Sequence, residues 1–240
     1  LITRMDSGQD LYIGLMSGTS SDAIDAALVR FSDSGCELVS TLAATLDAPI
    51  LDRIKRAVDG TADRISDISE LDVLLAQAFA DTALLLKDQA GVDQITAIGS
   101  HGQTVRHQPR GCLPYTVQLG NGARIAALTG ITTVSDFRTA DLALGGQGAP
   151  LVPAFHRAIF SDSDENRVIV NIGGIANVTV LHRKDRPSGF DTGPGNTLMD
   201  HWFRQHQPGI YDENGTWARS GTCLPKLLRT LLECDYFSRH

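Results

Sequence analysis

The alternation of apolar and polar residues predicts that the chain begins with three strands. Apolar runs at 11–16 and 24–31 flank a short turn rich in serine and glycine, a pattern typical of a β-hairpin. A third apolar run follows at 36–42. We therefore expect an antiparallel, three-stranded meander at the start of the chain.

Helical spacing then replaces the strand pattern. Pro49 predicts the start of a helix and Gly60 its end. The apolar face of this helix comprises Ile50, Ile54 and Val58. A longer helix is predicted from Ser69 to Gly91, where Ser69 and Asp72 resemble a capping box. Its apolar stripe consists of Leu71, Leu74, Leu75, Ala78, Phe79, Leu85 and Leu86. We interpret this stripe as core rather than as a binding face.

The rest of the chain alternates strands with helices, as α/β folds do. Strands are predicted at 95–98, 115–119 and 131–134, and helices at 123–128 and through Phe155 and Ile159.

A polar run at 161–166 is the best candidate for a domain boundary. Beyond it, apolar runs at 168–172 and 175–180 flank a two-glycine turn, which repeats the strand–turn–strand pattern of the N-terminus. We therefore predict an N-terminal lobe at 1–160 and a second lobe at 167–240.

Composition narrows the class of protein. Of the 240 residues, 42% are hydrophobic and 20% are charged, as in a globular protein with a sizeable core. The net charge of −7, without a Lys/Arg cluster, argues against a nucleic-acid partner. No apolar run reaches membrane-spanning length. The four cysteines form no Cys-x-x-Cys pair, so we expect reduced thiols, a cytoplasmic location and no zinc site.

The segment Gly189–Asn196 provides the first chemical signal. It places the carboxylate of Asp191 in a glycine-rich turn, and Asn196 can cap the helix that the following apolar residues predict. An acid before a helix N-terminus suits the handling of a proton beside a phosphate. The plainer alternative, in which Asp191 only satisfies backbone amides of the turn, stays open.

Two glycine-containing turns are candidates for binding phosphates, because their backbone amides form concave anion sites. We assign this role to Gly18, Thr19, Ser20, Gly173, Gly174 and Asn177. Asp22 could hold a magnesium ion through water. The alternative that Asp22 and Asp25 merely decorate the first hairpin stays open.

Polar side chains that follow two of the predicted strands are candidates for binding a small molecule, because ligands collect beyond the carboxyl ends of strands in α/β sheets. These candidates, with a glutamine between glycines, are His101, Gln103, Thr104, Asp136, Arg138 and Gln147. Arg138 is the natural partner for a substrate carboxylate. Each residue alone is more often structural, but together they favour a polyhydroxylated or acidic ligand.

Five motifs follow one another along the chain: Met16–Asp25, Gly99–Thr104, Gly145–His156, Asn171–Val178 and Gly189–Asn196. In sequence and order they resemble the anhydro-N-acetylmuramic acid kinases, from about Tyr12 to the C-terminus. The resemblance implies a hexokinase/actin-type fold with two ribonuclease-H-like lobes around a nucleotide cleft. It also implies ATP, Mg²⁺ and a role in recycling peptidoglycan sugars in the bacterial cytoplasm.

The reaction that the resemblance implies couples hydrolysis to phosphorylation. Water attacks the anomeric carbon of 1,6-anhydro-N-acetylmuramic acid, and the freed 6-oxygen takes the γ-phosphoryl group of ATP to give N-acetylmuramic acid 6-phosphate. Asp191 would be the general base for the water. The nucleotide-binding residues of the first turn would be Gly18, Thr19, Ser20, Ser21, Asp22, Ala23, Ile24 and Asp25, with Asp22 also at the metal.

The chain departs from the family pattern in two respects. Ser21 stands where an aliphatic residue is usual and Ala23 where glycine is usual, so a methyl group at residue 23 is expected to strain a close phosphate approach. Family members also continue beyond the point that matches His240, so we expect an incomplete second lobe. A truncated, non-catalytic sugar-binding protein of the same fold is therefore an alternative, as is an ATPase or phosphatase. A homodimer also stays open.

Overall fold

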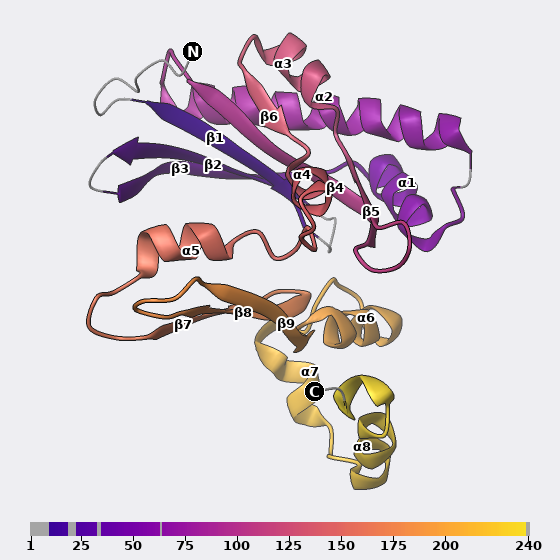
Figure 1. The fold of residues 1–240 in the computed structure, drawn as a ribbon. Coiled ribbons are helices and arrows are strands. Elements are labelled where there is room, and N and C mark those ends of the chain that lie inside the picture. Colours follow the sequence, from indigo (N-terminus) through magenta and orange to yellow (C-terminus); the bar gives the residue numbers. More distant parts are fainter. Residues whose placement is uncertain (1–9, 19–22, 33–34, 63, 239–240) are drawn as a thin grey trace. The chain divides into compact units, whose positions relative to one another are not determined.

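The computed structural model describes residues 10–18, 23–32, 35–62 and 64–238, which pack into two compact units (Figure 1). The first unit contains the described residues up to Asn171 together with Ala176–Thr192, and the second contains Ile172–Ile175 and the described residues from Gly193 onward. These units do not coincide with the lobes expected at 1–160 and 167–240, which stay a prediction.

A mixed sheet forms the centre of the first unit. Its strands are β1 (Leu11–Ser17), β2 (Ala23–Ser32), β3 (Gly35–Thr45), β4 (Ala97–Gln108), β5 (Tyr115–Leu119) and β6 (Thr133–Ser135). The strand order is β3-β2-β1-β4-β5, and β6 also pairs with β4. β4 runs parallel to β1 and β6, whereas the other pairs are antiparallel. The N-terminal meander and the α/β class are therefore confirmed.

β4 changes partner along its length, near Gly102. Its first half pairs with β1 and β6, and from Gln103 onward it pairs with β5. Gly102 has a φ of 73°, and a Cβ there would meet the carbonyl oxygen of Leu119 at 2.6 Å, so glycine is required. The prediction that the strand ends at 98 is wrong. Pairing with β1 continues the hydrogen-bond ladder to Gln103, and pairing with β5 continues it to Gln108.

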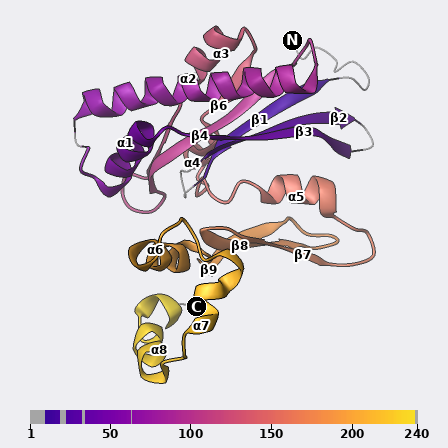
Figure 2. The ribbon, with the colours of Figure 1, turned by 180° about the vertical axis from the view of Figure 1, so that it is seen from behind.

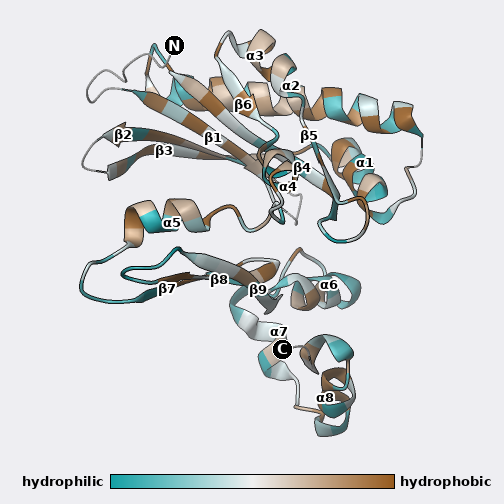
Figure 3. Cartoon of the chain, in the orientation of Figure 1, coloured by the Kyte–Doolittle hydropathy of each residue, from teal (hydrophilic) through white to brown (hydrophobic). Residues whose placement is uncertain are grey.

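Two helices, α1 (Ala48–Asp59) and α2 (Ile65–Ala90), contribute most of the helical residues in the core of this unit (Figures 1 and 2). The long α2 lies along one face of the sheet, and its residues alternate between hydrophobic and hydrophilic stretches (Figure 3). Its buried residues are Leu71, Leu75, Ala76, Phe79, Ala80, Thr82, Ala83 and Leu86, mostly one helical turn apart. The interpretation of this stripe as core is confirmed for most of its members, but Leu74 and Leu85 are exposed.

The predicted start of α2 at Ser69 is wrong. Ser69 lies in the second turn of a helix that begins at Ile65, and its Oγ donates back to the Ile65 carbonyl oxygen over 2.8 Å. Asp72 accepts instead from the backbone N–H of Gly120, also over 2.8 Å. Serine bonds backbone groups inside helices as well as at their ends, so the spacing of Ser69 and Asp72 did not identify a cap.

Three short helices and a second sheet complete this part of the chain. The helices are α3 (Gly122–Thr129), α4 (Phe137–Ala143) and α5 (Pro153–Phe160). The second sheet has the order β7-β8-β9, formed by β7 (Arg167–Ile172), β8 (Ile175–Leu181) and β9 (Ser188–Pro194). The ring nitrogen Nδ1 of His156 lies 2.9 Å from the hydroxyl of Thr179, which links α5 to β8.

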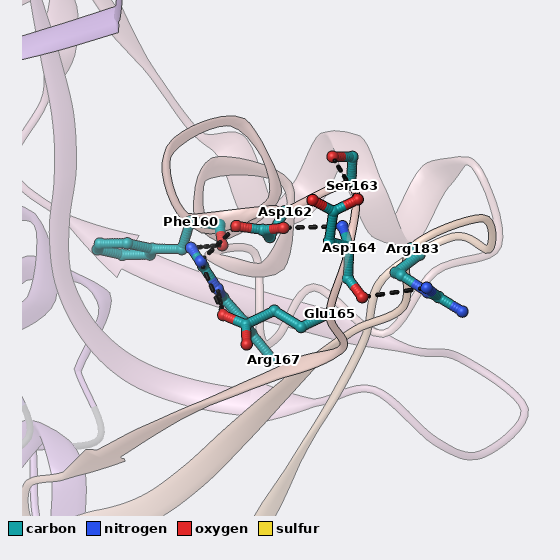
Figure 4. Close-up of polar contacts among 7 residues, drawn as sticks. All are labelled: Phe160, Asp162, Ser163, Asp164, Glu165, Arg167 and Arg183. Atoms are coloured by element: carbon teal, nitrogen blue, oxygen red, sulfur yellow. Dashed lines mark hydrogen bonds and ion pairs between the residues drawn. The ribbon is translucent and has the colours of Figure 1, made fainter.

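Two arginines hold the polar segment that connects α5 to β7 (Figure 4). Arg167 forms ion pairs with Asp162 at 2.5 Å and with Glu165 at 2.8 Å, and Arg183 donates to the carbonyl oxygen of Asp164 over 3.0 Å. The backbone N–H of Asp164, together with Arg167, lowers the pKa of Asp162. The segment therefore follows a defined path set by hydrogen bonds.

The second unit contains three helices: α6 (Thr197–His206), α7 (Thr216–Ser220) and α8 (Pro225–Leu232). Short 3-10 turns occur at Glu213–Gly215 and Asp235–Ser238. Phe203 is buried and packs edge-on against Trp217, with ring centroids 5.7 Å apart. The leucines of α8 are exposed. Among the described residues, no helix is both long enough and apolar enough to cross a membrane.

Candidate active site

His101 on β4 and Arg138 on α4 form a hydrogen-bonded pair. Arg138 Nε donates to His101 Nε2 over 2.8 Å, and Arg138 Nη1 donates to the carbonyl oxygen of Gly148 over 2.7 Å. His101 Nδ1 lies 2.9 Å from the carbonyl oxygen of Gly102, so the ring proton belongs on Nδ1. The structure thus brings together two of the expected substrate residues.

Burial keeps this histidine neutral. It lowers the pKa of His101, the hydrogen bond to Gly102 partly offsets this, and the charge of Arg138 lowers the pKa further. Neutral His101 presents a lone pair on Nε2, which holds the guanidinium in one orientation. Arg138 retains three N–H groups after its bonds to His101 and Gly148, so it can still bind a carboxylate.

Asp141 shapes the glycine-rich loop that supports Arg138. Its Oδ2 accepts from the backbone N–H of Gly148 over 2.7 Å, and its carbonyl oxygen accepts from Gly146 over 2.9 Å. A Cβ on Gly146 would overlap the Asp141 carboxylate, and Gly148 has a φ of 69°. Glycine is therefore required at both positions. Gln147, expected at the substrate, is exposed between them.

Asp191 lies on β9, and its charge acts on side chains from β4 and α4. Burial lowers the pKa of Arg138, and Asp191 partly offsets this effect. Burial and Arg138 lower the pKa of His107, which Asp191 again opposes. The expectation that Asp191 lies in a turn is wrong, because its segment is a strand paired with β8. Its side chain is exposed and can reach a ligand or water.

Gln103 and Thr104 contact protein groups in this structure. Gln103 is 1% exposed; its Oε1 accepts from the Ser17 hydroxyl over 2.6 Å, and its Nε2 donates to the carbonyl oxygen of Gly18 over 3.4 Å. Thr104 Oγ1 accepts from the side chain of Gln118 over 3.2 Å. Gln103 thereby ties the end of β1, where the first turn begins, to β4. A direct contact of either residue with substrate stays a prediction.

Half of the first phosphate turn lies outside the described residues, namely Thr19, Ser20, Ser21 and Asp22. On the far side, Ala23 opens β2 opposite Thr45, and its φ is not in the left-handed region. Alanine therefore suits the backbone at this position, although a glycine is usual in the family. The side chain of Ile24 is buried, whereas Asp25 is exposed.

The second phosphate turn is bonded to the start of α6. The carbonyl oxygens of Gly173 and Gly174 accept from the backbone N–H groups of Asn196 and Gly195, each over 2.9 Å. Asn196 is the N-cap residue, as expected, but its side chain makes no capping bond. Asn177 is half-buried on β8. Phosphate binding by this turn stays a prediction.

Two cavities adjoin His101. One, of about 410 Å³, lies between α2, β4, β5 and α3, and includes Asp136 with Ser100 and Gln118. The other, of about 480 Å³, includes Asp25 and Phe137. Asp136 has a φ of 64°, uncommon for a residue other than glycine, and its carboxylate does not cap α4.

Ser100 and Gln118, which line the first cavity, are not among the site residues that the sequence predicted. Ser100 lies within the motif Gly99–Thr104, which was a usable signal, whereas nothing in the sequence around Gln118 distinguishes it.

The amino-acid sequence matches a known protein family along most of its length. The family described as anhydro-N-acetylmuramic acid kinase matches residues 10–240. Curated relatives of that name include proteins from Coxiella burnetii (strain Dugway 5J108-111), 49% identical over 233 residues, and Vibrio vulnificus (strain CMCP6), 48% identical over 232 residues. The alignments cover 95% and 96% of this chain but 62% and 63% of those proteins. The chain therefore spans about three fifths of the length of these relatives.

Similarity to solved structures is weaker. A reductive activator for a corrinoid, iron–sulfur protein has a TM-score of 0.43 and 15% identity, covering 79% of this chain and 32% of that one. A Ppx/GppA phosphatase from Aquifex aeolicus has a TM-score of 0.40 and 12% identity, covering 81% and 56%. At these values neither supports an assignment of function, so the family match stands on sequence.

Proposed function

Because the chain belongs to the anhydro-N-acetylmuramic acid kinase family, we propose that it carries the sugar site and the catalytic base of an ATP-dependent kinase. The substrate is 1,6-anhydro-N-acetylmuramic acid, and the product is N-acetylmuramic acid 6-phosphate. We place this reaction in the cytoplasm, in the recycling of peptidoglycan sugars. The proposal includes a hexokinase/actin-type fold with lobes at 1–160 and 167–240.

The grouping of Asp191 with Arg138 carries the proposal. Asp191 lies on β9 and Arg138 on α4, yet the charge of Asp191 raises the pKa of Arg138 against the effect of burial. A carboxylate near a guanidinium supplies what the reaction needs, namely a base for the water and a cation for the lactyl carboxylate of the sugar. His101 holds the guanidinium of Arg138 through the 2.8 Å hydrogen bond.

In the proposed chemical step, the exposed carboxylate of Asp191 acts as the base. Asp191 takes a proton from water as the water oxygen bonds to the anomeric carbon and the bond from that carbon to the 6-oxygen breaks. The 6-oxygen takes the γ-phosphoryl group, and ADP leaves. General base catalysis of this kind contributes roughly 10²–10⁴ in rate. Arg138 would hold the lactyl group so that the anomeric carbon faces Asp191.

The nucleotide would bind at the first turn and at the two-glycine turn. Backbone groups of Gly18, Gly173 and Gly174 would contact phosphates, and Ile24 could contribute only its main chain because its side chain lies in the core. Mg²⁺ would neutralise phosphate charge, held through water by Asp22, which lies outside the described residues. The exposed carboxylate of Asp25, which shares a cavity with His101, would be a further oxygen ligand of the type that Mg²⁺ prefers.

Mass spectrometry of the sugar tests the proposal. The protein is incubated with ATP, Mg²⁺ and the anhydro sugar, and the expected product is heavier by one water and one HPO₃ unit. The product should be absent when ATP is omitted. Sugar that binds but stays unchanged would favour the non-catalytic binding protein. ATP consumption that is independent of sugar would favour an ATPase or phosphatase.

A further inference from the structure

Two buried polar atoms have no hydrogen-bond partner among the described residues: Oγ of Ser100 and Oε1 of Gln118. Ser100 is 1% exposed, and both residues line the cavity of about 410 Å³ between α2, β4, β5 and α3, which we call the Ser100 pocket. Buried polar atoms in folded proteins are generally paired, so an unpaired one calls for an explanation. Two in the same cavity indicate a ligand.

The orientation of the Gln118 amide is fixed by its neighbours. Its Nε2 donates to Thr116 Oγ1 over 2.6 Å and to Thr104 Oγ1 over 3.2 Å, which uses both of its hydrogens. The Thr116 hydroxyl donates its own hydrogen to the carbonyl oxygen of Arg106 over 3.3 Å, so it must accept from Gln118. The free atom is therefore an acceptor, whereas Ser100 can supply a donor.

The wall of the Ser100 pocket leaves no room for additional side-chain atoms. A Cβ on Gly120 would meet the ring of Phe79 at 2.9 Å, and a Cβ on Gly122 would overlap the hydroxyl of Ser135. Glycine is therefore required at both of these positions in the wall of the pocket.

The charges in the Ser100 pocket exclude an anion. Its described lining contains the carboxylates of Asp72 and Asp136 and no lysine or arginine. One acceptor of Asp72 is already bonded to the backbone N–H of Gly120. A phosphate or carboxylate in the pocket would be repelled by these negative charges. The ligand group is therefore not an anion.

We infer that the Ser100 pocket binds the acetamido group of the sugar substrate. Ser100 Oγ donates to the acetamido carbonyl oxygen, and Gln118 Oε1 accepts from its N–H. A secondary amide presents one acceptor and one donor, which matches the two unpaired atoms one for one. The inference rests on the proposed function, because His101 and Asp136 border both the pocket and the proposed sugar site. Beyond the proposed function, it names the acetamido group as a part of the sugar that the site recognises, and Ser100 and Gln118 as the residues that recognise it.

Calorimetric titration of the intact protein with two neutral sugars tests this inference. N-acetylglucosamine carries the acetamido group, and glucose has a hydroxyl in its place. We expect tighter binding of N-acetylglucosamine, and we expect Ser100→Ala to weaken it roughly fivefold to tenfold while leaving glucose unchanged, as for one lost hydrogen bond. The matched control is Ser69→Ala, because Ser69 lines the same pocket but its hydroxyl already donates to Ile65.

The outcomes separate this inference from the proposed function. Equal binding of the two sugars, or no binding of either, would show that the Ser100 pocket holds water only and would overturn the inference. So would equal phosphorylation rates for the anhydro sugar and its deacetylated analogue, although the kinase proposal would then stand. If N-acetylglucosamine binds in a Ser100-dependent way but the anhydro sugar is not phosphorylated, the inference would be supported and the proposed kinase function would be wrong.

Discussion

Replacing Arg138 by alanine should destabilise the first unit as well as weaken sugar binding. The substitution removes two hydrogen bonds from a charged donor, one to His101 Nε2 at 2.8 Å and one to the Gly148 carbonyl oxygen at 2.7 Å. A hydrogen bond from a charged group contributes about 1.5–3 kcal/mol, and the lower end applies to a half-exposed side chain. We therefore expect a loss of about 3 kcal/mol in the free energy of unfolding.

Urea unfolding followed by far-ultraviolet circular dichroism measures this loss, with the exposed Arg157→Ala as the matched control. The control should change the free energy of unfolding by less than about 0.5 kcal/mol. Calorimetry with each ligand should show that Arg138→Ala weakens sugar binding far more than ATP binding. A loss of stability no larger than that of Arg157→Ala would refute the supporting role of the His101–Arg138 pair. Equal losses of affinity for sugar and ATP would refute its substrate role.

Three further predictions concern the same unit. Lowering the pH below about 6.5 should reduce the stability of the first unit until the lowered folded-state pKa of His101 is reached, because in this range only the unfolded chain gains a proton on His101. Urea titrations should show a shallower fall in stability for His101→Gln. An equal fall in the variant and the wild type would contradict this. Gly146→Ala should cost about 1–3 kcal/mol by displacing Asp141, whereas Gly14→Ala, which has open space around it, should be nearly neutral in the same assay. Hydrogen exchange should be slowest in the buried stripe of α2, and fast exchange there would show that α2 is not the core.

Local sequence patterns predicted the helices and strands whose conformation is favoured by their own residues. Alternation identified β1, β2 and β3, and Pro49 and Gly60 marked the two ends of α1, with Gly60 in the left-handed conformation. The pattern of residues 115–119 gave β5 with the bounds that the structure shows. In each case the residues themselves carry the preference, through side-chain alternation or fixed backbone angles.

Features that depend on distant partners could not be predicted in this way. β4 continues past residue 98 because β1, β5 and β6 pair with it, and a single sequence contains no record of those pairings. Asp191 lies in a strand for the same reason, since glycine-rich segments suggest turns until a neighbouring strand is known.

In the candidate site, too, the sequence indicated individual residues but not their contacts with distant partners. Their positions after predicted strands identified His101 and Arg138 as polar residues of interest, but did not show that one holds the other. Gln103, expected at the substrate, is buried, because the hydroxyl of Ser17 and the carbonyl oxygen of Gly18 use its amide. The unpaired atoms of Ser100 and Gln118 emerge only from the packing of four elements around one cavity.

The rate of ATP-dependent sugar phosphorylation by Asp191→Asn tests the central claim most directly. Asparagine has nearly the same shape as aspartate but cannot take the proton from water, so the variant should fold normally. The matched control is Asp185→Asn, an exposed residue between β8 and β9. We predict a loss of at least about 100-fold in kcat for Asp191→Asn and none for Asp185→Asn. Turnover of Asp191→Asn near the wild-type rate would show that this carboxylate is structural and would contradict the account.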